Sequence, residues 1–239
     1  MSEWAAKRFW NEATTTEVEG GYAIHLDGRG VKTPAKTPLV VPTAALAGRI
    51  AAEWDAQDEV INPGTMPFTR TANSALDKVA TQHAEVAEML AAYGDADLLC
   101  YRADSPEALV ARQAERWDPL LDWAGATLGA RLEPRTGVIH APQDPGALAA
   151  LSGRVHAQGA FELAAFHDLV GLSGSLILAF ATTEGHADPD TLWELSRLDE
   201  RWQEEQWGVD DEARAIEAIK QAEFLHAAQF WQLSTDRPA

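Results

Sequence analysis

The chain has little of the chemistry on which many functional classes depend. It has a single cysteine among 239 residues, so no disulfide can form within the chain, and we expect a reducing compartment. This residue, Cys100, lies in the apolar stretch Leu98 to Tyr101. That setting predicts a buried, unreactive thiol, not a nucleophile.

Basic residues are also scarce. The chain carries 19 Lys and Arg against 37 Asp and Glu, a net charge of −18. Phosphate contacts need clustered cations, so this balance argues against nucleic acid and against an anionic membrane surface as partners. The first ten residues lack the apolar core of a signal peptide, which predicts a cytoplasmic protein.

No long hydrophobic run is present. The longest extends from Leu169 to Thr182, which is shorter than the roughly 20 apolar residues that a membrane-spanning helix needs. We therefore expect no membrane insertion and interpret this run as a buried core helix.

Patterns that carry catalysis or bind metals are likewise missing. Gly171-Leu172-Ser173-Gly174-Ser175 lacks the final glycine of a hydrolase nucleophile elbow, and Gly28-Arg29-Gly30 lacks the third glycine of a dinucleotide-binding loop. The seven histidines show no ligand spacing, and we interpret His167-Asp168 as a structural pair. The sequence predicts no catalytic residue, no metal, no cofactor and no enzymatic activity.

The first part of the chain has the alternation of β-strands. Apolar and polar residues alternate from Thr14 to Val18 and from Tyr22 to Leu26, and Asp27-Gly28 marks a tight turn. A short strand at Leu39–Val41 precedes a helix that begins at Pro42-Thr43 and extends to about Gln57. Asn62-Pro63-Gly64 is the clearest break.

Beyond this break nearly everything reads as helix. We expect a long helix from Met66 to Tyr93, and helix starts at Ser105-Pro106, Asp118-Pro119 and Asp188-Pro189. Residues 132–140 have room for two short strands. The predicted fold is α+β: a small strand-rich N-terminal domain with one helix, residues 1–64, followed by a larger all-helical C-terminal domain, residues 65–239.

The segment from Glu184 to Glu212 contains 11 acidic residues against 2 arginines, together with three tryptophans. An α-helix from Asp190 to about Gln206 would place Leu192, Leu195, Leu198 and Trp202 in one apolar stripe. Trp193 falls on the opposite side, among Arg197, Glu200 and Glu204, and Trp207 drifts toward that side. Trp193 then either contacts a partner or is covered by a neighbouring helix.

A second polar surface is predicted on the helix that follows residue 66. Arg70, Asn73 and Asp77 share one face by their spacing of three and four residues. A polar network that bridges the two domains is the first interpretation. A ligand site on this face, in an enzyme or a small-molecule binding protein, is the alternative.

Short stretches along nearly the whole chain resemble the assembly chaperones of the F(1) sector of ATP synthase, in the family that attends the alpha subunit. The resemblance rests on their number, order and spacing: Asp27-Gly28-Arg29, Val31-Lys32-Thr33-Pro34, Glu53-Trp54-Asp55-Ala56-Gln57, Met66-Pro67, Arg70-Thr71-Ala72-Asn73, Asp97-Leu98-Leu99-Cys100-Tyr101, Trp117-Asp118-Pro119-Leu120, His167 with Gly171-Leu172-Ser173-Gly174-Ser175, and Trp202-Gln203-Glu204-Glu205-Gln206-Trp207-Gly208.

This resemblance implies a chaperone with no ATPase activity of its own. It implies binding to the unassembled alpha subunit, whose beta-facing surface would otherwise be exposed, and release as the alpha–beta interface forms. It also implies that one carboxylate of the acidic segment is important for function. Glu200, Glu204 and Glu205 are the three candidates. We expect a partner surface made by Trp193, Glu200, Glu204, Glu205 and Trp207, on a protein that is a monomer when free.

Overall fold

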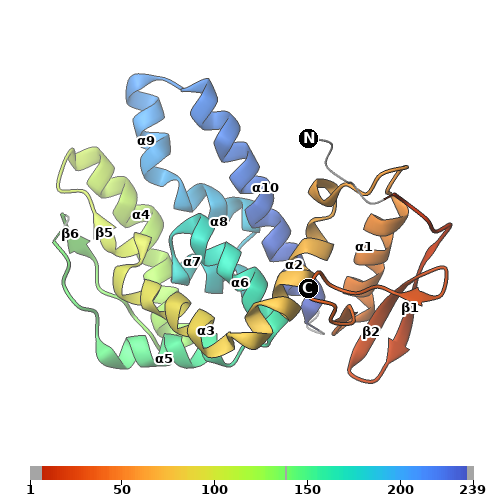
Figure 1. The fold of residues 1–239 in the computed structure, drawn as a ribbon. Helices are drawn as coiled ribbons and strands as arrows, with labels where there is room; N and C mark the ends of the chain where they lie inside the picture. The colour runs from red at the N-terminus through yellow and green to blue at the C-terminus, as the bar shows by residue number, and fades with distance from the viewer. Residues whose placement is uncertain (1–6, 138, 236–239) are drawn as a thin grey trace. The chain divides into compact units, whose positions relative to one another are not determined.

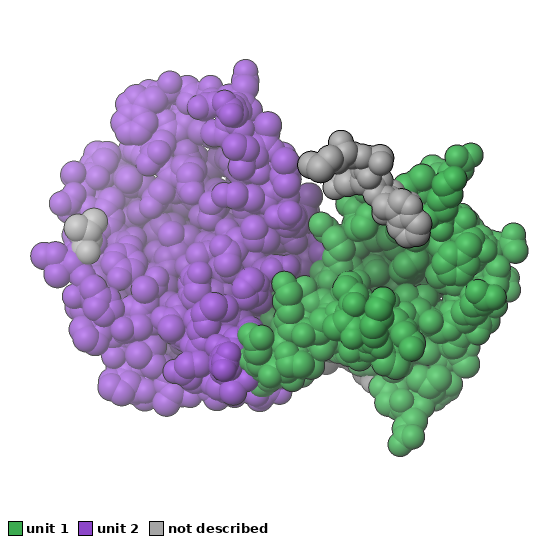
Figure 2. Space-filling view, viewed as in Figure 1, with its two compact units in different colours: residues 1–83, 159–165, 229–239 green, residues 84–158, 166–228 purple. Residues whose placement is uncertain are grey.

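The structure is a computed structural model that describes residues 7–137 and 139–235, and its architecture confirms the α+β prediction (Figure 1). The chain separates into two compact units (Figure 2). One contains residues 1–83, 159–165 and 229–239, and the other residues 84–158 and 166–228. These units differ in extent from the predicted domains, whose boundary after residue 64 stays a prediction.

The strands are β1 Ala13–Val18, β2 Gly21–Leu26, β3 Arg29–Gly30, β4 Val40–Val41, β5 Tyr101–Arg102 and β6 Arg135–Thr136. The α-helices are α1 Ala44–Asp55, α2 Pro67–Asp77, α3 His83–Ala91, α4 Glu107–Trp123, α5 Pro145–His156, α6 Ala160–Ser173, α7 Leu176–Thr183, α8 Pro189–Ser196, α9 Leu198–Trp207 and α10 Asp211–Ser234. Short 3₁₀ turns lie at Pro63–Thr65, Val79–Thr81, Ala92–Ala96 and Leu98–Cys100, and a π turn lies at Ala124–Leu128.

The N-terminal strands form an antiparallel sheet centred on β2. Strand β1 pairs with one edge of β2 over its whole length, while β3 and β4 pair with the other edge. Asp27 and Gly28 both have positive φ, at 47° and 78°, as a two-residue hairpin turn between twisted strands requires. The predicted turn at this dipeptide is confirmed.

Helix α1 covers the sheet and completes the core of this unit. Thr43 caps the helix, because its hydroxyl oxygen accepts a hydrogen bond from the backbone N–H of Leu46. The apolar positions of α1, including Ile50, are buried with Ile24 of β2 and Val41 of β4. This packing determines which face of the sheet is covered by α1.

In the second unit, helix α7 is the most buried element, with every residue from Leu176 to Ala181 inside the core. A buried carboxylate fixes its start. Asp97 accepts hydrogen bonds from the Ser175 hydroxyl at 2.8 Å and the Ile177 N–H at 3.0 Å. Cys100 lies nearby in sequence and is buried, as predicted, and burial raises the pKa of its thiol to about 12.

Three predicted helices are interrupted in the structure, so their predicted continuity was wrong. The span Met66–Tyr93 breaks after Asp77, where the Thr81 hydroxyl donates to the carbonyl of Lys78 and competes with helical bonding. The apolar run Leu169–Thr182 is two helices joined at Gly174, whose φ is +73°. The third break, at Arg197, changes the candidate site and is described below.

Two predicted helix starts also need correction. Pro119 lies inside α4 and does not begin a new helix. Trp117 and Leu120, on either side of it, are buried, and this packing offsets the hydrogen bond that proline cannot donate. At the start of α4 the Ser105 hydroxyl donates to Asp104 and caps no helical N–H. The predicted cap at Asp188-Pro189 is confirmed, because Asp188 accepts from the N–H of Asp190.

The C-terminal region is not entirely helical. Strands β5 and β6 form a short parallel pair, Tyr101 with Arg135 and Arg102 with Thr136, so one of the two strands allowed for in residues 132–140 is present. In the part of the chain that the structure describes, no helix combines the length and apolarity that crossing a bilayer demands.

Candidate functional site

The acidic segment contains α8, α9 and the first residues of α10, and α9 and α10 run back alongside each other (Figure 1). Helix α9 ends at Trp207, and Gly208 leaves the helix with a φ of +89°. Asp210 then caps α10, because its carboxylate accepts hydrogen bonds from the N–H groups of Glu212 and Ala213. We call residues 198–223, which comprise α9, this turn and the first part of α10, the α9–α10 arm.

Ion pairs, not an apolar core, join the two helices of the arm. The guanidinium of Arg201 contacts Glu194 of α8 at 2.9 Å, Glu204 of α9 at 3.3 Å, and Glu217 of α10. Glu194 and Glu217 raise the pKa of Arg201 above its usual range, while Arg201 lowers the pKa of Glu217. Arg201 therefore ties three helices together.

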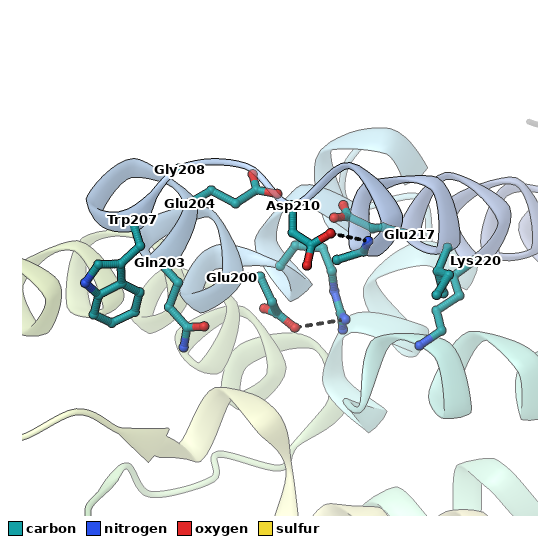
Figure 3. A pocket seen from close by; sticks show the side chains of 11 residues that line it. Glu200, Gln203, Glu204, Trp207, Gly208, Asp210, Glu217 and Lys220 are labelled. Atoms are coloured by element: carbon teal, nitrogen blue, oxygen red, sulfur yellow. Dashed lines mark hydrogen bonds and ion pairs between the residues drawn. The ribbon is translucent and has the colours of Figure 1, made fainter.

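A groove of about 450 Å³ lies along the arm (Figure 3). Figure 3 shows Trp207 at one end of the groove and Lys220 at the other. The lining combines apolar and charged side chains, and its members are Arg197, Glu200, Gln203, Glu204, Trp207, Gly208, Asp210, Ala213, Ile216, Glu217 and Lys220.

Large apolar side chains of the arm are exposed to solvent. Trp207 is 79% exposed, and Val209, Ile216 and Ile219 are 47%, 50% and 62% exposed. Single exposed apolar residues are common on protein surfaces, but four on one two-helix arm, rimmed by carboxylates, are typical of a protein-binding surface.

Of the five predicted site residues, three line this groove: Glu200, Glu204 and Trp207. Glu200 forms an ion pair with Arg197 at 3.1 Å, and Glu204 with Arg201 and Arg214. The two carboxylates therefore differ, because Glu204 holds the arm together while Glu200 lies at its exposed rim.

Glu205 does not line this groove. It forms an ion pair with Arg112 of α4 at 2.7 Å, and this pair lowers the pKa of Glu205. The Arg112 guanidinium also lies over the ring of Trp202, 4.7 Å from its centroid. Trp202, predicted as core, is half-buried beneath this cation.

Trp193 is fully buried, which overturns the helix projection that placed it on the outer side. The expected helix breaks at Arg197, whose φ of −106° and ψ of 16° are not helical. The break re-aims α8, and Trp193 packs against Phe224 of α10 with ring centroids 5.5 Å apart. Of the two possibilities left open, the neighbouring helix covers this ring.

The sequence prediction missed Ile216 and Ile219 because it did not project α10. The buried positions of this helix include Phe224, Ala227 and Trp231. At 100° per residue, Ile219 lies about 140° from Phe224, on the solvent side. A projection of α10 would therefore have found the apolar surface.

One residue of the alternative polar face, Asp77, is used within the N-terminal unit. Asp77 accepts hydrogen bonds from the Thr33 hydroxyl at 2.6 Å and the Ala35 N–H at 3.0 Å, and these bonds lower its pKa. The carboxylate thus fixes the loop between β3 and β4. Among the described residues no cluster of three or more His, Cys, Asp or Glu side chains could hold a metal ion.

Comparison with known proteins places this fold and sequence in a family. Residues 7–125 match the family described as "ATP12 chaperone protein". Protein atp12, mitochondrial, from Schizosaccharomyces pombe is 28% identical over 227 residues, covering 88% of this chain and 77% of that protein.

Solved structures agree along nearly the whole chain. Atp12 from Paracoccus denitrificans is 52% identical with a TM-score of 0.95, over 98% of this chain and all of that one. The Atu1473 protein from Agrobacterium tumefaciens is 44% identical with a TM-score of 0.91, over 96% of this chain and 86% of that one. The chain therefore belongs to the ATP12 chaperone family, which confirms the family of F(1) assembly chaperones that its sequence resembles.

Proposed function

We propose that this chaperone binds the unassembled alpha subunit of F(1) through the α9–α10 arm and shields the surface that alpha later presents to beta. The observation that carries the proposal is the set of exposed apolar side chains on the arm, led by Trp207. A protein that must cover an apolar surface of its client needs an apolar surface of its own.

The structure of the arm suits temporary binding. Its groove has Glu200 and Asp210 at the rim, so the contact combines apolar burial with charge. A contact of this kind forms quickly and gives way when the native alpha–beta interface, larger and more apolar, becomes available. Trp193, being buried, has no place in this contact surface.

Glu200 and Glu205 are proposed to face alpha directly, while Glu204 acts by holding the arm in shape. Glu200 and Glu205 have exposed carboxylates with one basic partner each. Glu204 is less exposed and bridges Arg201 and Arg214. We also propose that the protein is a cytoplasmic monomer when free and hydrolyses no ATP, as its family membership favours.

The test is to mix purified alpha subunit with this chaperone and measure the mass of the complex by light scattering after size-exclusion chromatography. We expect a one-to-one complex, less aggregation of alpha, and release when beta is added. The absence of a complex at micromolar concentrations would contradict the proposal. ATP hydrolysis above background that a single substitution in the chaperone abolishes would contradict the assignment as a non-enzyme.

A further inference from the structure

Strand β1 presents a free backbone edge. Asp27 donates its N–H to the carbonyl of Glu12 at 3.2 Å, which extends the register in which Ala13 faces Leu26. Hydrogen-bonded and non-bonded pairs alternate in an antiparallel ladder. Thr14 and Thr16 therefore direct their backbone groups to β2, whereas Ala13, Thr15 and Glu17 direct theirs to the outer edge.

Only the start of this outer edge is occupied. The N–H of Ala13 donates to the carboxylate of Asp55 in α1 at 2.7 Å. No group in residues 7–137 or 139–235 bonds the outward N–H and C=O groups of Thr15 and Glu17. Beyond Ala13, every residue of β1 is exposed. A short row of backbone donors and acceptors thus faces solvent.

Natural proteins usually block such an edge with proline, lysine, a β-bulge or a very short strand. β1 has six residues paired in unbroken register with β2, and its sequence Ala13-Thr14-Thr15-Thr16-Glu17-Val18 contains neither proline nor lysine. Threonine and valine favour the extended conformation. The edge therefore has the geometry of a template for one more strand.

Charge indicates which strand would fit. Residues 11–19, which comprise β1 and its flanks, contain three acidic side chains, Glu12, Glu17 and Glu19, and no lysine or arginine. Two copies of β1 paired edge to edge would bring these carboxylates together, which is unfavourable. An extended segment that carries lysine or arginine is attracted to the same edge.

We propose that the β1 edge binds an extended, basic segment of the unassembled alpha subunit as an added strand. This inference rests on the proposed function. The β1 edge would be a second site that contacts alpha, in addition to the α9–α10 arm. The strand would pair with Thr15 and Glu17 through main-chain hydrogen bonds. A segment held in this way cannot pair with another unfinished chain, so the edge would also limit aggregation of its client.

Hydrogen exchange at single-residue resolution tests the geometry in the full-length protein, with purified alpha subunit as the probe. In the free chaperone, the amides of Thr14 and Thr16 should exchange slowly and those of Thr15 and Glu17 fast. On binding alpha, Thr15 and Glu17 should become protected. If alpha binds and both amides stay fast, the added strand is refuted while the proposed function stands.

Substitutions give a second measurement. Thr15→Pro removes an outward N–H without removing a bond to β2, and should weaken alpha binding about tenfold. Thr15→Val keeps the N–H and should bind like the wild type, and Glu17→Lys should weaken binding through its charge. Slow exchange in β2 verifies that each variant is folded. If Thr15→Pro is folded and binds like Thr15→Val, the inference is wrong. If neither the wild type nor any variant binds alpha, the inference and the proposed function are both wrong.

Discussion

Trp193 and Trp207 have opposite environments although both belong to the acidic segment. Trp193 is enclosed by Phe224 and by the guanidinium of Arg197, 4.9 Å from its ring centroid, whereas Trp207 ends α9 in solvent. At the residue scale, burial decides whether a large aromatic side chain contributes to stability or remains available to a partner.

We expect Trp193→Ala to lower the free energy of unfolding by about 3–5 kcal/mol, because it removes a fully buried ring. Trp207→Ala should change it by less than about 0.5 kcal/mol, and should weaken alpha binding roughly tenfold or more. Urea unfolding and a binding titration measure the two effects. Equal losses of stability in the two variants would show that the exposure of Trp207 is not as described.

Asp97 links stability to pH. Burial, opposed by its hydrogen bonds, raises the pKa of its carboxyl above the usual 3.8. Between 3.8 and the raised value the folded chain binds more protons than the unfolded chain, so the free energy of unfolding falls as pH rises through this window. Asp97→Asn cannot ionise at this position. The free energy of unfolding of Asp97→Asn minus that of the wild type should therefore increase as pH rises through this window.

The measurement is urea unfolding of wild type and Asp97→Asn between about pH 4 and pH 7. The difference between the two curves isolates this residue from the many surface carboxylates. Curves that stay parallel over the whole range would mean that Asp97 has an ordinary pKa in the folded protein.

At the scale of elements, the sequence predicts helices better than it predicts where they break. Alternation located β1 and β2, and Asp188 marked the start of α8, because these signals are local. The breaks at Lys78 and Arg197 have no proline or glycine to announce them. The break after Asp77 has a local bond from the Thr81 hydroxyl to the Lys78 carbonyl and a bond from the distant Thr33 hydroxyl to Asp77, and neither can be read from the local sequence pattern.

The same limit explains the candidate site. Charge and aromatic content identified the segment that forms the arm, and Glu200, Glu204 and Trp207 indeed line one groove. The break at Arg197 could not be seen, and without it the projection gave Trp193 the wrong side. The roles of Glu204 and Glu205 depend on Arg201 and Arg112, which only the folded chain brings to them.

Arg201 should be the residue that positions the arm. Arg201→Gln leaves Glu194, Glu204 and Glu217 facing one another without a cation, and we expect a loss of about 1–2 kcal/mol in local stability. Hydrogen exchange in residues 198–217 should become faster. Arg214→Gln removes one ion pair from a more exposed arginine and should change exchange little. Similar exchange in the two variants would exclude a special role for Arg201.

Across the whole molecule, the net charge of −18 creates a negative field that favours approach of a basic client surface. The described ion pairs neutralise part of it inside the structure, so individual carboxylates do not contribute equally. Glu204 is committed to Arg201 and Arg214, whereas Glu200 and Glu205 remain exposed beside one arginine each. The field at the arm therefore depends on a few exposed groups.

We expect Glu200→Gln with Glu205→Gln to slow association with alpha severalfold at low salt while leaving dissociation nearly unchanged. The effect should fade as salt is added, because exposed charges are screened within about 8–10 Å near physiological ionic strength. Stopped-flow binding at several salt concentrations measures both rates. Glu85→Gln with Glu133→Gln is the matched control, because it removes two exposed carboxylates outside the arm and leaves the arm unaltered. If this control slows association as much as the double variant, only net charge matters, and the carboxylates of the arm hold no privileged position in recognising alpha.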